Sequence, residues 1–544
     1  MDITPRPDSG QHQVPGFPGC LTFAVCFFFA CTVLAQGSRP STQPTLALKS
    51  PPAALTANSI AVVWDKPLGV SVEGYDVYQG STLVGTTHYT DYTLHGLSPA
   101  GEYEISVVAR MASGEALRSN TLRLATRPAP AEFNIIKYGA VADGKTLNTR
   151  SIQSAIDACS PGGVVRIPKG TFLSGAIFLK SDMTLYLDEG ATLLGSPDAK
   201  DYPVMKYRFE GREQNCYASL INTPTVQQGA RWRNITLAGS GTINANGVAL
   251  RRNEVAESAG IRGRAVCIRD TDDLYLQGIT VRQSPAWTVH LIYCNGVTLN
   301  GVSIHSKYDE AGNPYAGIVN GDGLDPDSCR DVFIFDCTIA SQDDCIAIKS
   351  GRDAEGRAVG IPSENFRISH CRFNSGFGVA MGSEMSGGVR NVLVEDCVFN
   401  DTFSIASVKA PRGRGGAIEN ITYRDCSLSN KSTEHKDGQW FRGALYVDNF
   451  YGVAEFDPRQ AWPSDQGTPV IRNILFQNIT LDTVGGNAIY LTGLPESPLQ
   501  NVRFENVTAT GETGFIANNV RGLSLDKVTV KARNGDAMRF TNVK

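Results

Sequence analysis

One short template of strand, polar turn and strand recurs along most of the chain. Copies begin at Leu185, Leu274, Val297, Val332, Phe366, Val392, Ile421, Ile474, Val502 and Leu523, for example LYLQGITV and VFIFDCTI. Within each copy apolar side chains alternate with polar ones, as strands that bury one face require. Repeats that each bury a face against the next copy are typical of a solenoid. We therefore predict an all-β protein in which residues 131–544 form a right-handed parallel β-helix of about ten coils.

Two details refine this prediction. The interval from Ile421 to Ile474 is 53 residues, so an extra coil or an insertion is expected there. A single amphipathic helix is predicted from Asn148 or Thr149 to about Cys159, where it would cap the open end of the stack. A leucine-rich horseshoe is the structural alternative, but the repeats lack its helices and its Leu/Asn signature.

A different pattern precedes the repeats. Short runs of alternating apolar and polar residues over 51–127 predict an N-terminal β-sandwich. Trp64, the run YDVY from Tyr75 and the run LSPAGEY ending at Tyr103 resemble a fibronectin type III domain, with Tyr103 as its corner tyrosine. The stiff stretch RPAP from Arg127 separates this domain from the β-helix.

The first 50 residues have the composition of an export segment followed by a linker. A polar lead, the apolar run CLTFAVCFFFACTVLA and small residues after it predict a signal peptide over 1–35, and the Ser/Pro/Gln-rich stretch 36–50 a linker. The run is shorter than the roughly 20 residues a membrane span needs, so a membrane anchor is disfavoured. We expect a secreted or periplasmic protein with no membrane association after export.

Cysteine usage and charge exclude several other classes. Four cysteines recur at one position of the template and predict a buried stack rather than disulfides: Cys337, Cys371, Cys397 and Cys426. No cysteine or histidine spacing indicates a metal site. A formal charge of −4 gives no basic face for nucleic acid.

Three acids gather in one stretch of the repeats. Asp343 follows Asp322 by 21 residues, which is about one coil, so Asp322 is expected about 5 Å from the later pair on the neighbouring strand. Asp343 and Asp344 are adjacent and would face opposite sides of a regular strand, so the strand must bend for both to face solvent. Aspartates in turns and polar ladders are the structural alternative.

Crowded carboxylates offer a specific chemistry. Like charges a few ångströms apart raise the pKa of at least one of the acids. One protonated acid beside ionised carboxylates is the combination that glycosidic cleavage needs.

The chain from 131 to 544 resembles the polygalacturonase family, glycoside hydrolase family 28. Four motifs carry the resemblance: NGDGLDPDSC from Asn320, SQDDCIAIKSGRDAEG from Ser341, GSEMSGGVRNV from Gly382 and PRGRGG from Pro411. The resemblance implies that Asp343 is the general acid and that Asp322 and Asp344 activate water for attack with inversion. It implies substrate contacts from Asn320 and Lys409, and neither metal nor cofactor.

Two positions depart from the family pattern. Phe377 stands where the family has the His of Gly-His-Gly, and Ser407 where it has the Arg of Arg-Ile-Lys. Arg clamps a carboxylate with two hydrogen bonds, which Ser cannot replace. Both residues are assigned to substrate binding, Phe377 as a ring that stacks on a sugar or packs in the core. Four other basic residues nearby are expected to be solvated in turns: Lys349, Arg352, Arg412 and Arg414.

The predicted function is a monomeric, pectin-degrading hydrolase that cleaves galacturonosyl linkages. A rhamnogalacturonan-type glycosidase and an inactive pectin-binding β-helix remain alternatives. A pectate lyase shares the fold but relies on calcium and an Arg base, and the Asp-Asp pair followed by IKSG favours hydrolysis. Exo and endo attack both remain open. By analogy with exo-acting members, residues 431–469 form a loop that closes one end of the cleft, with Trp440, Phe441, Tyr446 and Trp462.

Overall fold

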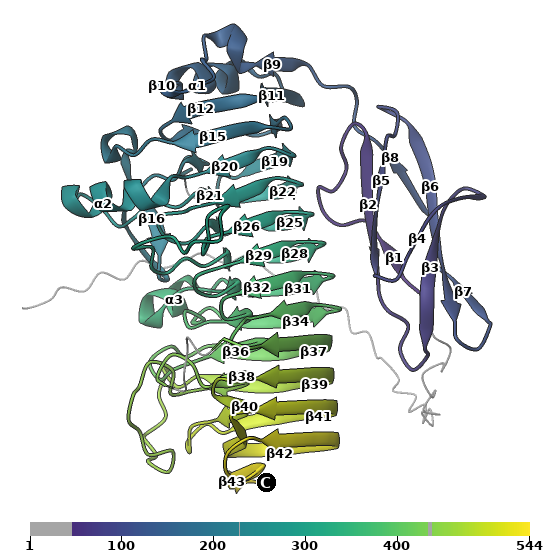
Figure 1. Cartoon of the computed structure of the whole chain (residues 1–544), viewed down its shortest axis with the longest axis vertical. Helices are drawn as coiled ribbons and strands as arrows, with labels where there is room; N and C mark the ends of the chain where they lie inside the picture. Colours follow the sequence, from purple (N-terminus) through teal and green to yellow (C-terminus); the bar gives the residue numbers. More distant parts are fainter. Residues whose placement is uncertain (1–45, 228, 433–437) are drawn as a thin grey trace, which may run out of the picture. The chain divides into compact units, whose positions relative to one another are not determined.

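The computed structural model describes residues 46–227, 229–432 and 438–544. The predicted export segment lies outside the described residues. Among the described residues, no helix is long and apolar enough to cross a membrane. The described chain contains antiparallel sheets near its N-terminus and a long stack of parallel strands after them (Figure 1).

The N-terminal sandwich is built from antiparallel strands. One sheet contains β1 (Leu48–Lys49), β2 (Ser59–Trp64) and β5 (Asp91–His95). The other contains β4 (Thr82–Thr87), β3 (Val72–Gln79), β6 (Glu102–Met111), β7 (Ala116–Arg118) and β8 (Leu122–Ala125). The Tyr103 hydroxyl accepts a hydrogen bond from the Ser98 amide at 2.8 Å, as a corner tyrosine does. Since β1 falls in the stretch predicted as linker, the sandwich begins before residue 51.

The parallel strands form three stacks, which confirms the right-handed β-helix. The first stack contains β9 (Glu132–Asn134), β11 (Gly163–Ile167), β14 (Met183–Leu187), β19 (Trp232–Gly239), β22 (Thr271–Gln277), β25 (Asn295–Asn300), β28 (Arg330–Phe335), β31 (Ser363–Ser369), β34 (Val389–Glu395), β37 (Ala417–Asn430), β39 (Val470–Thr483), β41 (Leu499–Gly511) and β42 (Thr513–Ala532). The second contains β10 (Asp143–Leu147), β12 (Gly170–Ser174), β15 (Ala191–Gly195), β20 (Thr242–Asn244), β23 (Thr280–Arg282), β26 (Ser303–His305), β29 (Thr338–Ala340), β32 (Arg372–Ser375) and β35 (Val398–Asn400).

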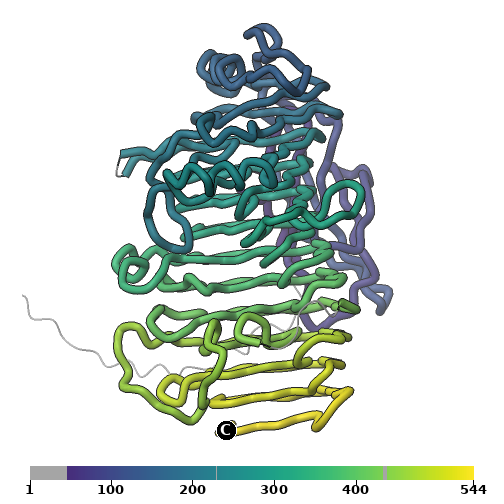
Figure 2. Tube along the Cα trace, turned by 60° about the vertical axis from the view of Figure 1, so that its left-hand side comes forward, coloured from purple at the N-terminus to yellow at the C-terminus, as the bar shows by residue number. Residues whose placement is uncertain are grey.

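The third stack carries the acids. It contains β13 (Ile177–Phe178), β18 (Ile221–Asn222), β21 (Val266–Arg269), β24 (Val289–Ile292), β27 (Leu324–Asp327), β30 (Ile346–Ile348), β33 (Val379–Met381), β36 (Ala406–Lys409), β38 (Gly443–Asp448), β40 (Asn487–Thr492), the first part of β42 and β43 (Met538–Val543). Successive rungs run nearly parallel down the coil (Figure 2). Ile421 pairs directly with Ile474, so the 53-residue interval holds an insertion within one coil and no extra coil.

Apolar side chains inside the coil and asparagines in one of its turns keep the repeat regular. Apolar side chains pack continuously inside it, and the four stacked cysteines are buried and free, as predicted. At one turn a ladder of asparagines with left-handed backbone links the coils: the Asn420 amide donates to Asn391 Oδ1 at 3.1 Å, and the Asn473 amide to Asn420 Oδ1 at 3.0 Å. Asn tolerates the left-handed region better than other non-glycine residues.

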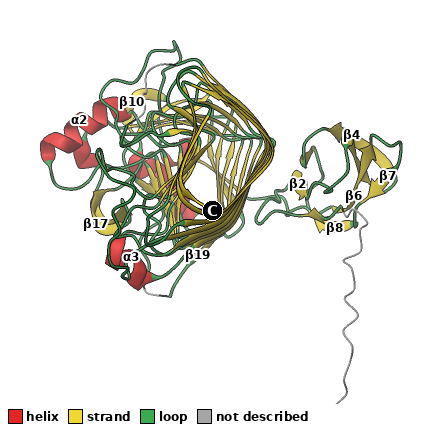
Figure 3. Ribbon diagram, turned by 90° about the horizontal axis from the view of Figure 1, so that it is seen from below, coloured by secondary structure: helices red, strands yellow, loops and turns green. Residues whose placement is uncertain are grey.

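The helices and one hairpin interrupt the repeat. α1 (Thr149–Ala158) is the predicted cap, with Ile152, Ala155 and Ile156 buried. Sequence reasoning missed α2 (Gly247–Glu257), α3 (Asp353–Val359), the short η1 (Ile135–Tyr138) and η2 (Ala199–Asp201), and the hairpin of β16 (Val204–Phe209) and β17 (Arg212–Tyr217). The elements α2, α3 and β17 lie on the same side of the coils (Figure 3). They are insertions between rungs, so the repeat carries no signal for them.

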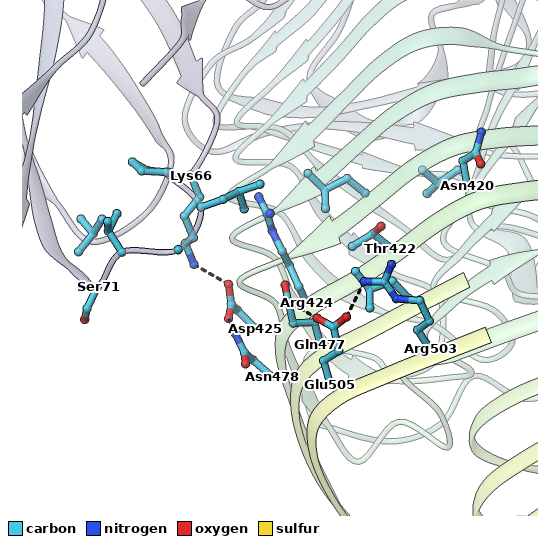
Figure 4. A pocket seen from close by; sticks show the side chains of 18 of the residues that line it. Lys66, Ser71, Asn420, Thr422, Arg424, Asp425, Gln477, Asn478, Arg503 and Glu505 are labelled. Carbon is cyan, nitrogen blue, oxygen red and sulfur yellow. Dashed lines mark hydrogen bonds and ion pairs between the residues drawn. The ribbon is translucent and has the colours of Figure 1, made fainter. Parts of the chain in front are cut away.

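Charged residues of the turns also contact the sandwich. Lys66 Nζ lies 2.7 Å from Asp396 Oδ1. It also lies 2.8 Å from Asp425 Oδ2 (Figure 4). Beside this pair is a groove of about 920 Å³, lined by residues 66–72 and by coil residues that include Arg424 and Arg503. None of the three acids lines this groove.

Candidate active site

The acids lie at equivalent places on two consecutive rungs of the third stack. Leu324 of β27 pairs with Ile346 of β30, and Asp322 and Asp344 each precede these residues by two positions. The Gly323 amide donates to the Asp344 carbonyl at 2.9 Å, which fixes this register. One oxygen from each of Asp322, Asp343 and Asp344 lies within 4.8 Å of the others. The expected spacing of about 5 Å is therefore confirmed.

A bend lets both members of the adjacent pair reach the same space. The chain bends at Gln342 and Asp343 before β30 begins. The Asp344 amide donates to Asp343 Oδ1 at 2.9 Å, and the Phe377 amide donates to the Asp343 carbonyl at 3.1 Å. As a result Asp343 and Asp344 line one cleft with Asp322, as the prediction of a bent strand required.

Burial tunes two of the three acids. Asp322 and Asp344 are each 3% exposed, whereas Asp343 is half-buried. Burial raises the pKa of Asp322 well above its usual range, and the charges of Asp325 and Asp343 add to this shift. Burial also raises the pKa of Asp344, while the charge of Lys409 opposes it.

Two lysines supply positive charge beside the acids. Lys409 Nζ, at the end of β36, lies 2.6 Å from Asp344 Oδ2. Burial lowers the pKa of Lys409, but Asp344 and the neighbouring Tyr451, Tyr446 and Asp343 together leave that pKa raised. Lys349 Nζ lies 3.1 Å from Glu384 and 3.6 Å from Asp325. The acids are therefore held in a network of opposite charges.

The cleft above the acids has a volume of about 420 Å³, within the usual range for small-molecule sites. Its lining comes from the rungs and from the insertions: Glu210, Trp287, Asn320, Asp322, Asp343, Asp344, Lys349, Arg352, Ser383, Glu384, Lys409, Pro411, Arg414, Trp440, Tyr451 and Gly452. A site that combines five carboxylates, two lysines and two arginines can transfer protons and bind a polar, anionic ligand.

Comparisons with known proteins identify the family. Residues 164–530 match the family described as "Glycosyl hydrolases family 28", and residues 50–124 match the fibronectin type III domain. The chain belongs to glycosyl hydrolase family 28. A "Probable polygalacturonase" of Vitis vinifera is 31% identical over 69% of this chain and 73% of the relative. An "Exo-poly-alpha-D-galacturonosidase" of Dickeya chrysanthemi is 27% identical over 85% of this chain and 86% of the relative.

Solved structures agree on the fold. A family 28 exopolygalacturonase of Yersinia enterocolitica superimposes with a TM-score of 0.78 at 24% identity, covering 92% of this chain and 98% of that one. An exopolygalacturonase of Thermotoga maritima gives 0.57 at 25% identity, covering 76% and 91%. This family 28 member is therefore a glycoside hydrolase on a parallel β-helix.

Ser407 does not contact the cleft, so its assignment as a substrate-binding residue is wrong. Its side chain is 0% exposed, and its hydroxyl donates to the Phe377 carbonyl at 2.9 Å. Ser404 Oγ lies 2.7 Å away. Ala406 and Val408 of β36 face the core, so Ser407 lies on the opposite face, with Lys409. There it is buried beside Tyr446 of the following rung.

Phe377 is a packing residue more than a cleft residue. Its ring lies 5.2 Å from that of Phe403 and 6.1 Å from that of Phe441, in a cluster that also contains Tyr446 and Tyr490. Phe377 is half-buried and does not line the cleft. Of the two roles considered for it, the core ring is the one that the structure supports.

Asn320 lines the cleft, and its partner could not be found from sequence. Arg262 donates from one guanidinium nitrogen to Asn320 Oδ1 at 2.9 Å and from another to the Val319 carbonyl at 2.7 Å. Arg262 follows α2, an insertion that the repeat does not predict.

Three of the four basic residues expected in solvated turns line the cleft instead: Lys349, Arg352 and Arg414. Arg414 donates to the Ser383 carbonyl at 2.7 Å and pairs with Asp353. Arg412 pairs with Glu496 away from the cleft lining. Their signal was present in the motifs IKSGRD and GRGG.

Proposed function

We propose that this chain hydrolyses galacturonosyl linkages of pectin and does so from chain ends. The observation that carries the proposal is the trio Asp322, Asp343 and Asp344 within 4.8 Å, in a cleft that also contains Lys409. Relatives named as polygalacturonases support the substrate. The intact trio argues against an inactive binding protein.

Asp343 is proposed as the general acid. It is the most exposed of the three and can protonate the leaving oxygen. Asp322 Oδ1 and Asp344 Oδ1 are buried and have no hydrogen-bond partner among the described residues. Both oxygens can hold an attacking water, and Asp344, whose ionised form Lys409 favours, can take its proton. Lys409 keeps Asp344 oriented and favours its ionised form.

Inversion is proposed although the acids are close. Inverting enzymes commonly hold their two carboxyl groups about 6.5–9.5 Å apart, and retaining ones about 5–5.5 Å. The trio is closer than the inverting range. A third carboxylate changes the geometry, because Asp322 and Asp344 together can bind water without a gap between acid and base. Proton NMR of the first product anomer tests this step, and a retained anomer rules out single displacement.

Attack from chain ends is supported by the walls of the cleft. The β16–β17 hairpin contributes Glu210, and the insertion within 431–469 contributes Trp440 and Tyr451. Two relatives, of Dickeya chrysanthemi and Thermotoga maritima, are named as exo-acting. Export by the predicted signal peptide would bring the enzyme to its polymer.

A rhamnogalacturonan backbone is the second candidate substrate. The absence of a bidentate Arg at position 407 favours it, since a neutral sugar needs no such clamp. Against it, Arg352 and Arg414 line the cleft and offer alternative partners for a carboxylate.

One experiment separates these candidates. The purified enzyme is incubated with homogalacturonan and with rhamnogalacturonan backbone, with and without a chelator, and products are sized over time. We expect short galacturonides from the start, no unsaturated ends and no effect of chelation. Loss of activity with the chelator favours a lyase, mixed long products favour endo attack, and cleavage of rhamnogalacturonan alone favours the second candidate.

A further inference from the structure

The segment 431–469, expected to be one loop, contains rung β38, which carries Tyr446. Two tryptophans on either side of this rung are equally exposed but differ in position. Trp440 and Trp462 are each 54% exposed. Trp440 lines the cleft that holds the acids, and Trp462 does not. The guanidinium of Arg412 lies 4.5 Å from the ring centroid of Trp462, whereas within the described residues no cation lies over Trp440. Trp440 therefore presents a partly exposed indole to the cleft.

The indole of Trp440 is fixed in place by its neighbours. Tyr451 packs edge-to-face against it, with ring centroids 5.1 Å apart at 68°. The Gly452 amide donates to the Gln439 carbonyl at 2.9 Å, and a Cβ at Gly452 would lie 3.0 Å from the Trp440 ring. The next residue, Phe441, is buried in the aromatic cluster. A ring held this way loses little conformational entropy when a ligand binds.

The aromatic wall also contacts the catalytic machinery. Lys409 Nζ lies 5.0 Å from the centroid of the Tyr451 ring and 2.6 Å from Asp344 Oδ2. A sugar on Trp440 is thus within the same small cleft as the acids. The cationic side of this cleft carries Arg352 and Arg414, so charge recognition and ring recognition come from different walls.

We propose that Trp440, braced by Tyr451, is a stacking platform for one pyranose ring of the substrate. This inference rests on the proposed function and adds a binding site to it. The C–H face of a pyranose is apolar and packs on an indole, which carries a large apolar area and a negative face. Because no cation among the described residues lies over Trp440, this site recognises the ring and not its charge. It accepts a methyl-esterified galacturonate or a rhamnose as readily as a free galacturonate.

Binding in an Asp343→Asn background tests the platform without turnover. Calorimetry measures Kd for an oligogalacturonide, for its methyl ester and for a rhamnogalacturonan oligomer. Trp440→Ala is expected to raise Kd about tenfold for every ligand that the parent protein binds. The factor should be the same for the free acid and for the methyl ester. Trp440→Phe is expected to recover most of the loss. Trp462→Ala, equally exposed but outside the cleft, is expected to leave Kd unchanged.

The outcomes separate this inference from the function on which it rests. Unchanged Kd in Trp440→Ala, or an equal loss in Trp462→Ala, overturns the platform and leaves the function standing. A loss confined to the free acid also overturns it, because the site would then recognise charge. If the parent binds none of the three ligands, both proposals fail. Thermal unfolding of each variant shows whether a loss of binding follows from a loss of fold.

Discussion

The cleft has a floor and a wall that were built in different ways. The floor, with Asp322, Asp344 and Lys409, lies next to rungs that backbone pairing holds in register. The aromatic wall, with Trp440 and Tyr451, comes from the two segments that flank β38, which are held by side-chain packing and by isolated backbone hydrogen bonds. Strand pairing sets the distances between residues of the floor, and the sequence repeat determines this pairing. Side-chain packing sets the distances within the wall, and the repeat does not determine this packing. The chemistry should therefore depend on the floor and the choice of substrate on the wall.

The largest expected effect is on the floor. Asp343→Asn removes the proposed proton donor, and general acid catalysis is typically worth about 10²- to 10⁴-fold in rate. We expect kcat to fall by that factor, while the thermal midpoint and oligomer affinity stay close to wild type. Near-native turnover in this variant would show that another group donates the proton.

Lys409→Met tests the charge that supports the floor. Removing one partner of a buried ion pair costs about 3–5 kcal/mol of stability, and Asp344 then lacks the cation that opposes the rise of its pKa. If ionised Asp344 helps to activate water, the acid limb of the kcat/KM profile should move to higher pH. Unfolding in denaturant and a pH–rate profile measure the two effects. An acid limb at the same pH as in wild type would show that Lys409 does not affect the ionisation of the catalytic base.

Ser407→Arg tests whether the family clamp can be restored. The residue is fully buried and hydrogen-bonded to the Phe377 carbonyl, so an Arg there would overpack the rung and bury a charge without a partner. We expect a lower thermal midpoint and no gain on homogalacturonan. Ser407→Ala is the matched control, which should cost only about 1 kcal/mol for the lost hydrogen bond. A stable Ser407→Arg enzyme with improved homogalacturonan turnover would contradict the buried placement.

Most of the fold could be predicted because the same strand pattern recurs many times in the sequence. Each copy carries the same alternation, so the rungs, the stacked cysteines and the spacing from Asp322 to Asp344 followed from period and strand geometry alone. The insertions could not be predicted in this way. α2, α3 and the β16–β17 hairpin occur once each, and nothing in the repeat requires them.

The site divides along the same line. Asp322, Asp343, Asp344 and Lys409 were found because they occupy rung positions of recognisable motifs. Ser407 was misplaced because strand alternation puts it on the face of Lys409 but does not reveal that neighbouring side chains bury it there. Arg262 and Tyr451 were missed because their contacts join segments far apart in sequence, by 58 residues from Arg262 to Asn320.

The smallest expected effect is a difference between floor and wall in how the thermal midpoint of variants depends on pH. Since burial raises the pKa of Asp322 in the folded state, its protonation stabilises the fold, and this contribution is complete below the unfolded pKa of about 4 and is lost as pH rises through the folded value. Asp322→Asn, which carries no charge, should therefore raise the thermal midpoint at pH 7 by on the order of 1 °C and by nothing at pH 3. Trp440→Phe, on the uncharged wall, should show the same small change at both pH values. Calorimetric unfolding of the three proteins at pH 3 and pH 7 makes the comparison. If Asp322→Asn lowers the midpoint at pH 7, the charge of Asp322 stabilises the floor, and the wall and floor do not differ in the way proposed.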